Sequence, residues 1–305
     1  MKPFHGETPV APFPARQSDD PEAILNFARE ALSDGLNCGL VTLTEIVDGS
    51  SRRLGAQIAL RSDGGYCGYV SGGCIEAAAA REALDALTEG TDRFVRFGKG
   101  SPFFDIVLPC GGGLGLTIHV LRDDVALRDA CAALAQRRPT SLCYDRDTQT
   151  LTTSAATESG WHGSCFVTRY RPALRILLFG TGYEATTFAT LAESAGLEVI
   201  QNDMAALSSA DADTAIALLR HDVEGDVAVL QRAILSEAGY IGCLGGRSTH
   251  AKRVALLKEG GATEAQLARV HAPIGLFAQA RNAHAIAVSA LAEIIAHREA
   301  TLDAC

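Results

Sequence analysis

From Leu174 onward, short apolar strand patterns alternate with helix patterns, and this alternation constrains the fold more than any other feature. The expected strands are 176–179, 197–200, 214–219 and 240–244, and the expected helices are 186–195, 227–235, 250–258 and 283–297. Strands that alternate with helices form a parallel sheet covered by helices on both faces. The sequence therefore predicts an α/β fold with a Rossmann-like domain over residues 173–305.

A glycine turn follows the first of these strands. Gly180-x-Gly182-x-x-Ala185 has the spacing and the strand–helix context of a dinucleotide-binding turn, in which bare backbone lets a pyrophosphate approach the helix N-terminus. Asp203 ends the next strand, where a ribose-binding carboxylate belongs. Glu184, however, would repel a phosphate at this turn. Either the turn binds a nucleotide, or it serves packing or another ligand.

The N-terminal half has a different pattern. Residues 1–18 are expected to be a loose arm or one draped over the domain, and Asp20-Pro21 places an N-cap and a proline at the start of a helix. Strands and one Ala-rich helix follow up to residue 122, so residues 19–122 are expected to form an α+β domain. Residues 123–172 are expected to be a bridging segment of a helix, short strands and turns.

Within the α+β domain, the string from Ser71 to Glu76 carries a thiol beside glycines. Gly72 and Gly73 run into the start of the Ala-rich helix, with Cys74 in its first turn. Free N–H groups at a helix start stabilise a thiolate or bind an anion. The alternative is a small buried residue at a helix start.

Two further loops of this domain could contribute to the same chemistry. Cys110 lies in a glycine-rich turn with Gly111 and Gly112, where backbone N–H groups can form an anion-binding nest. The turn from Gly49 to Gly55 carries Arg52 and Arg53, which could supply cations to an anionic ligand or could be solvated.

Two loops of the C-terminal half are also candidates. Gly245, Gly246 and Arg247 follow a late strand and open a helix, which makes an anion contact there possible. His221, with Asp222 and Asp226, follows the preceding strand; it could bind a metal or act as an acid or base, or the group could order the loop.

Composition excludes several classes of function. The net charge of −9 comes without a basic stripe, so no nucleic-acid partner is expected. No apolar run approaches the roughly 20 residues that span a bilayer. Nine cysteines, an odd number without an export signal, favour free thiols in a reducing cytoplasm. No C-x-x-C pair indicates a structural zinc site.

Taken in order, these strings resemble the XdhC/CoxI family, the xanthine dehydrogenase accessory proteins. The likeness is carried by the turn at 49–55, by Ser-Gly-Gly-Cys-Ile-Glu at 71–76, by Pro-Cys-Gly-Gly at 109–112, and by the glycine turns and the His-Ala-Pro-Ile-Gly-Leu string at 271–276 of the second half. The C-terminal half departs from the family pattern: Thr181 and Tyr183 replace an alanine and a histidine, and Gly246 replaces a serine.

The resemblance implies an N-terminal α+β domain, a C-terminal Rossmann-like domain and a homodimer. It implies a non-enzymatic chaperone that binds molybdenum cofactor, protects it during sulfuration by a cysteine desulfurase, and delivers it to a xanthine dehydrogenase-like molybdenum hydroxylase. Cys74 and Cys110 become candidate contacts for molybdenum or sulfur, as soft ligands. The full set of candidate cofactor contacts is Cys74, Cys110, Gly72, Gly73, Glu76, Gly111, Gly112, Arg53, Gly180, Gly182, Asp203, His221, Gly245 and Arg247.

Two other hypotheses remain open. The first is an NAD(P)-dependent oxidoreductase that uses Gly180, Gly182 and Asp203, with His221 or Tyr183 as proton donor. The second is a thiol-based sulfur carrier that holds a persulfide on Cys74 without bound pterin.

Overall fold

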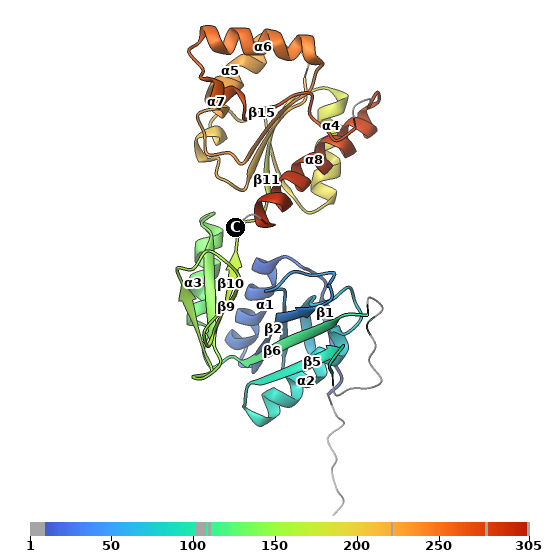
Figure 1. Cartoon of the computed structure of the whole chain (residues 1–305), viewed down its shortest axis with the longest axis vertical. Helices are drawn as coiled ribbons and strands as arrows, with labels where there is room; N and C mark the ends of the chain where they lie inside the picture. The colour runs from blue at the N-terminus through green and yellow to red at the C-terminus, as the bar shows by residue number, and fades with distance from the viewer. Residues whose placement is uncertain (1–9, 102–107, 109–110, 221, 278–279, 304–305) are drawn as a thin grey trace, which may run out of the picture. The chain divides into compact units, whose positions relative to one another are not determined.

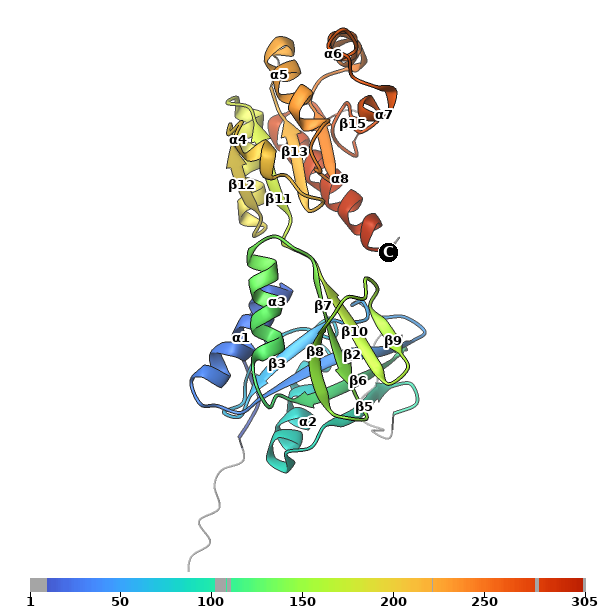
Figure 2. The same ribbon diagram turned by 90° about the vertical axis from the view of Figure 1, so that its left-hand side faces the viewer.

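A computed structural model describes the chain except residues 1–9, 102–107, 109–110, 221, 278–279 and 304–305. The chain divides into two compact units, Met1–Arg171 and Pro172–Cys305 (Figures 1 and 2). Each unit has hydrophobic clusters of its own.

The first unit is built on a six-stranded, largely antiparallel sheet. Its strands are β1 (Phe13–Arg16), β2 (Cys38–Val47), β3 (Gln57–Arg61), β4 (Gly65–Gly68), β5 (Arg93–Gly98) and β6 (Gly113–Val120), in the order β1-β4-β3-β2-β6-β5. Strands β3 and β4 form a hairpin, with Ile58 opposite Gly68. Of the two alternatives for the N-terminal arm, β1 fits the draped one, because this strand pairs in parallel with β4 at the edge of the sheet.

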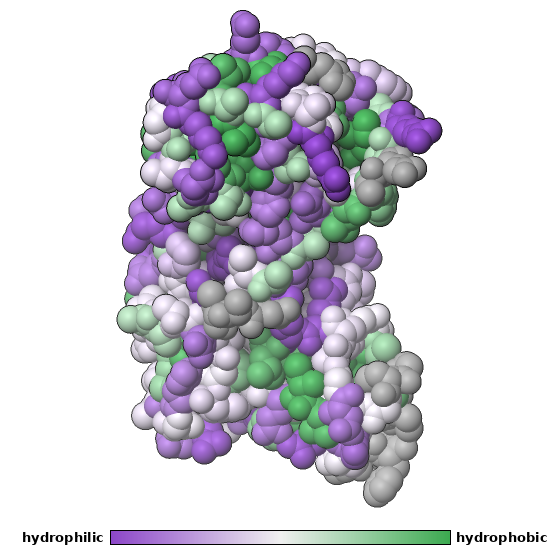
Figure 3. Space-filling model, turned by 45° about the horizontal axis from the view of Figure 1, so that its top comes forward, coloured by the Kyte–Doolittle hydropathy of each residue, from purple (hydrophilic) through white to green (hydrophobic). Residues whose placement is uncertain are grey.

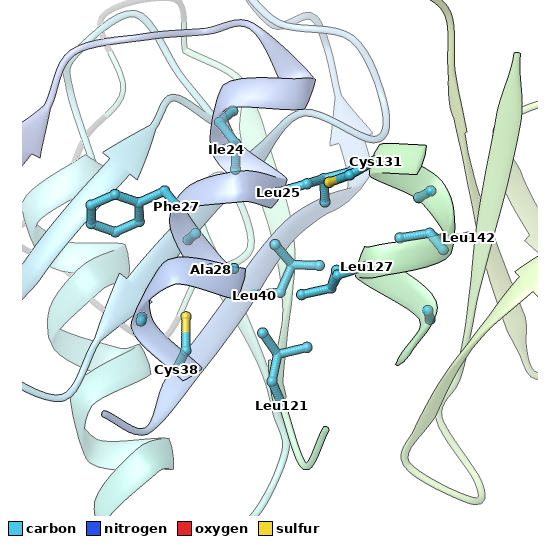
Figure 4. Packing of buried hydrophobic residues seen from close by; sticks show 14 of the residues in the cluster. Ile24, Leu25, Phe27, Ala28, Cys38, Leu40, Leu121, Leu127, Cys131 and Leu142 are labelled. Carbon is cyan, nitrogen blue, oxygen red and sulfur yellow. The ribbon is translucent and has the colours of Figure 1, made fainter. Parts of the chain in front are cut away.

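Helices cover both faces of this sheet. They are α1 (Pro21–Ser33), α2 (Glu76–Glu89) and α3 (Val125–Ala135). The predicted N-cap of α1 is confirmed, because the Asp20 carboxylate accepts the N–H of Ala23 at 3.1 Å. Successive side chains of β2 point to opposite faces of the sheet. Leu40 packs against α1 and α3, whereas Val41 packs in the cluster with α2. Figure 4 shows Leu25 of α1 beside Cys131 of α3, with Leu40 and Leu127 between the two helices.

Residues 140–170 form a second, four-stranded antiparallel sheet within the first unit (Figure 2). Its strands are β7 (Thr140–Asp145), β8 (Thr150–Ser154), β9 (Gly160–His162) and β10 (Cys165–Tyr170), in the order β8-β7-β10-β9. The segment expected to bridge two domains thus lies in the first unit. A buried polar contact ties it to the first sheet, because the Tyr170 hydroxyl donates to Gln57 Oε1 at 2.8 Å.

The second unit contains the predicted parallel sheet. Its strands are β11 (Arg175–Phe179), β12 (Glu198–Gln201), β13 (Thr214–Leu218), β14 (Tyr240–Cys243) and β15 (Val270–His271), in the order β12-β11-β13-β14-β15. Every pair is parallel. Because β12 is an edge strand, the polar residues at its end, Gln201 and Asn202, lie in solvent rather than in a core.

Helices lie on both faces of the parallel sheet, as expected for this topology (Figure 1). They are α4 (Tyr183–Ser194), the 3₁₀ turn η1 (Ala206–Ser209), α5 (Val223–Ala233), α6 (Arg247–Glu259), α7 (Glu264–Leu267) and α8 (Ala283–Asp303). Residues of α4 and α8 share one cluster with Ile176 and Leu178, and residues of α5 and α6 share another with Leu177 and Ile216. The predicted α/β fold is confirmed.

Exposed apolar side chains are dispersed. On the face drawn in Figure 3, green apolar residues form several separate patches among polar ones. Among the described residues, no helix is both long enough and apolar enough to span a bilayer.

Candidate functional site

Four connecting segments leave the first sheet at the same end, which we call its loop end. Strands β1, β2, β4 and β5 end there, whereas β3 and β6 begin there. For example, Val47 at the end of β2 and Gly98 at the end of β5 both pair with Gly113 at the start of β6. The segments are 17–20, 48–56, 69–75 and 99–112. The topology therefore gathers the three predicted loops of this unit at one edge, although they are far apart in the sequence.

Residues 69–75, the cysteine loop, are held by one buried carboxylate. Glu76 is 4% exposed and accepts the backbone N–H groups of Val70, Ser71 and Ile75 and the hydroxyl of Ser71. The Ser71 Oγ in turn accepts the N–H of Cys74 at 3.0 Å. With its oxygens used in this way, Glu76 positions the loop and is closed to a ligand.

Cys74 is exposed on this loop. It lies just before the N-cap residue, Ile75, so the expectation that it occupies the first turn of the helix is wrong. The amides of the neighbouring Gly72 and Gly73 are exposed and have no acceptor among the described residues. Soft sulfur and two free amides thus face solvent together, which suits a ligand that combines a metal or sulfur centre with negative charge.

The other thiols in the described part of the chain are all less exposed than Cys74, and Cys143 and Cys165 are half-buried. Cys38, Cys67, Cys131 and Cys243 are buried, and burial raises the pKa of each of them, that of Cys38 to about 12. A thiol that resists ionisation inside a core is a poor nucleophile and a poor ligand. This contrast singles out Cys74.

The basic turn reaches the cysteine loop through Arg52. Its Nε donates to the carbonyl of Ser71 at 3.3 Å, its Nη1 pairs with Asp19 at 2.8 Å, and the guanidinium lies over the ring of Tyr69. The predicted contact Arg53 is exposed at the same end. Arg52 thus touches the cysteine loop, which the sequence could not indicate, because Arg52 and Arg53 fit the pattern of the turn equally.

The third loop is described in part. Cys110 lies outside the described residues. Gly111 is exposed with φ +70°, and its N–H donates to the carbonyl of Leu108, while the carbonyl of Gly112 accepts the N–H of Lys99. Both glycines therefore lie at the loop end.

In the second unit, the predicted glycine turn joins β11 to α4. It lies at the point of the sheet where β11 and β13 are neighbours and the strand order reverses. Gly180 is buried, and a Cβ atom there would come within 2.4 Å of the Leu219 carbonyl oxygen. Asn202 holds the turn from the side, because its amide accepts the N–H of Gly180 and donates to the carbonyl of Gly180. Gly182 is the exposed N-cap of α4.

The remaining candidates of this unit follow the carboxyl ends of other strands. Asp203 is exposed and accepts the N–H of Ala205, directly before η1, at 2.8 Å. Gly245 and the exposed Arg247 lie between β14 and α6. His221 lies outside the described residues.

Asp222 and Asp226, which the sequence groups with His221 as a candidate metal or acid–base site, form structural contacts. Asp222 caps α5 by accepting the N–H of Gly225 at 3.0 Å. Asp226 is fully buried and paired with Arg220 and Arg253. Among the described residues, no group of three or more His, Cys, Asp or Glu side chains is placed to hold a metal ion.

A cavity of about 480 Å³ lies on the first unit, lined by none of the predicted site residues. Phe94 and Trp161 contribute aromatic faces to it, and Tyr144, Arg93 and Arg146 contribute polar ones. These residues come from strands and turns of both sheets of the unit, so their sequence spacing does not indicate the cavity.

Comparisons with known proteins agree with this architecture. Residues 176–294 match the XdhC Rossmann domain, and residues 31–98 match the XdhC and CoxI family. The chain is 44% identical over 285 residues to the molybdenum cofactor insertion chaperone PaoD of Escherichia coli K12, which covers 92% of this chain and 90% of PaoD. The chain belongs to the XdhC/CoxI family.

Two further proteins are similar at lower identity. The uncharacterized protein YqeB of Escherichia coli K12 is 28% identical over 277 residues, covering 88% of this chain and 45% of YqeB. A crystal structure described as a xanthine dehydrogenase from Bacillus halodurans superposes with a TM-score of 0.70, covering 90% of this chain and 96% of that one. At 18% identity, this last likeness shows the fold alone.

Proposed function

We propose that this chain is a molybdenum cofactor chaperone, and that Cys74 contacts the molybdenum or its sulfur ligand. The observation that carries the proposal is the exposed Cys74 thiol on a loop fixed by a buried carboxylate. The 44% identity to a cofactor insertion chaperone supports it.

The loop end of the first sheet supplies the other contacts. The amides of Gly72 and Gly73 offer hydrogen bonds to an anionic group. Arg52 and Arg53 add positive charge at the same edge, and Gly111 and Gly112 bring the Cys110 turn to it. The molybdenum cofactor is the cargo here, and the chain's own residues bind and orient it.

In this proposal the chain protects the cofactor while a cysteine desulfurase sulfurates it, and then transfers it to a xanthine dehydrogenase-like molybdenum hydroxylase. The chain acts in the cytoplasm and as a homodimer, without catalysing a reaction itself. Gly180, Gly182, Asp203, His221, Gly245 and Arg247 are proposed as contacts for a phosphate-bearing ligand in the second unit.

The test is anaerobic cofactor binding by the full chain. Wild type, Cys74→Ala, Cys110→Ala and Cys143→Ala are mixed with molybdenum cofactor, gel-filtered, and assayed for bound molybdenum and oxidised-pterin fluorescence. We expect wild type and the half-buried control Cys143→Ala to retain both signals, and Cys74→Ala to lose at least tenfold in retained molybdenum.

Retention of molybdenum and pterin by Cys74→Ala at the wild-type level would overturn the assignment of Cys74. Absence of binding by wild type would overturn the chaperone function itself. In a parallel assay, wild type that binds no cofactor but carries a persulfide on Cys74 would favour a sulfur carrier. Tight NADH binding with reduction of a carbonyl substrate would favour the oxidoreductase.

A further inference from the structure

A buried cluster of one carboxylate and two guanidiniums lies at the carboxyl edge of the parallel sheet. Asp226 is fully buried, and its Oδ1 accepts the Nε of Arg220 at 2.8 Å. Its Oδ2 accepts hydrogen bonds from the Nε and Nη2 of Arg253 at 2.9 and 2.5 Å. Because arginine keeps its charge in proteins, the two guanidiniums and one carboxylate leave the cluster with one net positive charge.

One nitrogen of this cluster has no partner. Arg253 is 0% exposed, yet its Nη1 is buried without an acceptor among the described residues. Its Nη2 also donates to the carbonyl of Leu244 at 2.8 Å, which fixes the direction of the guanidinium. A buried donor on a charged group is costly to leave unpaired, so such a nitrogen points to an acceptor that this chain binds.

The unpaired nitrogen faces the start of a helix. Arg253 Nη1 lies 3.4 Å from the position that a Cβ atom on Gly245 would take, directly before Gly246, the N-cap of α6. No side chain caps α6, and its first turn contains no acidic residue. Its first N–H groups lack intrahelical partners and carry the positive end of the helix dipole.

Two further side chains adjoin this cluster. Arg220 follows β13, is 25% exposed in its side chain, and donates its Nε to Asp226, while its terminal nitrogens have no acceptor among the described residues. His250, in the first turn of α6, has a buried Nδ1 without an acceptor among the described residues. Burial and the nearby Arg253 charge lower the pKa of His250, which agrees with a site already rich in positive charge.

We propose that the N-terminus of α6, Arg253 and Arg220 form a binding site for a phosphate or diphosphate group, with the exposed Arg247 closing over the bound anion. The site lies between β13 and β14, one strand beyond the glycine turn at Gly180. This site deepens and rests on the phosphate contact proposed above for Gly245 and Arg247. Because all of its residues belong to the second unit, it does not depend on the proposal for Cys74.

The test is isothermal titration of the full chain with sodium phosphate, sodium pyrophosphate and ADP in a buffer free of phosphate and sulfate. Wild type should bind pyrophosphate with a dissociation constant below about 1 mM. Arg247→Gln and Arg220→Gln should each weaken binding at least about tenfold, the effect of losing one charge-assisted hydrogen bond. Arg253→Lys keeps a cation beside Asp226 but removes the unpaired nitrogen, and should weaken binding similarly.

Lys252→Gln is the matched control, because it removes the same charge from the exposed face of α6 one residue from Arg253. It should change the affinity by less than about twofold, since solvent and salt screen an exposed charge. Inorganic phosphate binding as tightly as pyrophosphate and ADP would identify free phosphate as the ligand, whereas tighter binding of pyrophosphate or ADP would identify a diphosphate; both results support the site.

No pyrophosphate binding by wild type would overturn the proposal, as would equal weakening in Lys252→Gln and Arg247→Gln. If Arg253→Lys fails to fold by circular dichroism, the exposed Arg247→Gln and the Arg220→Gln variants still decide the result. A wild-type chain that binds pyrophosphate but no molybdenum cofactor would leave this site standing and remove the function proposed for Cys74.

Discussion

Glu76 illustrates how one buried carboxylate fixes the loop that carries an exposed thiol. Three backbone N–H groups and a hydroxyl converge on its two oxygens. The sequence places Glu76 directly after the cysteine loop, at the end of the Ser71–Glu76 string. The direction of its side chain, however, depends on the fold. A carboxylate near a predicted site looks the same in sequence whether it contacts the ligand or supports the loop.

Replacing Glu76 should separate these two roles. Glu76→Gln keeps the shape but removes the charge and one acceptor oxygen, so the first unit should lose about 1–3 kcal/mol of unfolding free energy. Cofactor retention should fall as well, because the cysteine loop is no longer fixed. Urea unfolding and retained molybdenum measure the two effects, and Glu89→Gln, at the exposed end of the same helix, is the control. Unchanged unfolding would contradict the positioning role.

Asp92 is a second buried carboxylate, located between the two sheets of the first unit. It pairs with His119 Nδ1 at 2.7 Å, and accepts the Tyr144 hydroxyl at 2.8 Å and the N–H of Val120 at 2.9 Å. Burial alone would raise the pKa of Asp92, but the hydrogen bond and charge of His119, with the other two donors, lower it. Burial and the contact with Asp92 also raise the pKa of Tyr144.

The sign of the pH effect follows from the lowered pKa of Asp92. The unfolded chain binds this proton more tightly, so the stability from Asp92 is fully present above about pH 4 and is lost as the pH falls through the folded-state pKa. Asp92→Asn should unfold about 2 kcal/mol more easily at pH 7 and should lose less stability than wild type between pH 5 and 3. Urea titrations at several pH values measure this, and parallel pH curves for the two proteins would refute it.

Among the helices, α1 and α3 are joined by a continuous core over the first sheet (Figure 4). Leu127 of α3 is fully buried there, whereas Val125 of the same helix is 49% exposed. Leu127→Ala should therefore destabilise the first unit by about 3 kcal/mol, and Val125→Ala by less than about 0.5 kcal/mol. Chemical unfolding of both variants checks this, and similar losses in the two would show that α3 is not held by this core.

Most helices and strands could be predicted from the sequence, because their signals are local. Asp20-Pro21 marks the start of α1, and strand–helix alternation from Leu174 gives the parallel sheet with boundaries displaced by a few residues. The pairing of β1 with β4 could not be predicted, because four exposed residues with a proline give no periodicity. The loop end could be inferred only when the strand order was known.

The candidate sites likewise contain some residues that the sequence indicates and others that only the fold brings together. Glycine spacing indicates Gly180 and the cysteine loop because such turns need bare backbone in a short stretch of chain. Arg253 has no such signal, because an arginine inside a helix pattern is typical of a solvated face. Its burial depends on Asp226, which lies 27 residues earlier and reaches it through the fold.

The two units have separate cores, and this predicts separate folding. The clusters of the second unit contain residues from 174 to 294, and those of the first contain residues from 24 to 170. Residues 172–305 expressed alone should melt cooperatively and retain pyrophosphate binding, since every residue of the phosphate site lies within them. Calorimetry and circular dichroism check this, and a fragment without a cooperative transition would contradict it.

The turn at Asp34-Gly35 lies at the end of the first sheet opposite the cysteine loop. Both residues are exposed, and a side chain on Gly35 would meet nothing within 4 Å. A short affinity peptide inserted after Asp34 would attach the protein to a sensor surface from the far side of that sheet. Cys74 would then point away from the sensor, so the capture and release of cofactor could be followed in real time on one immobilised sample.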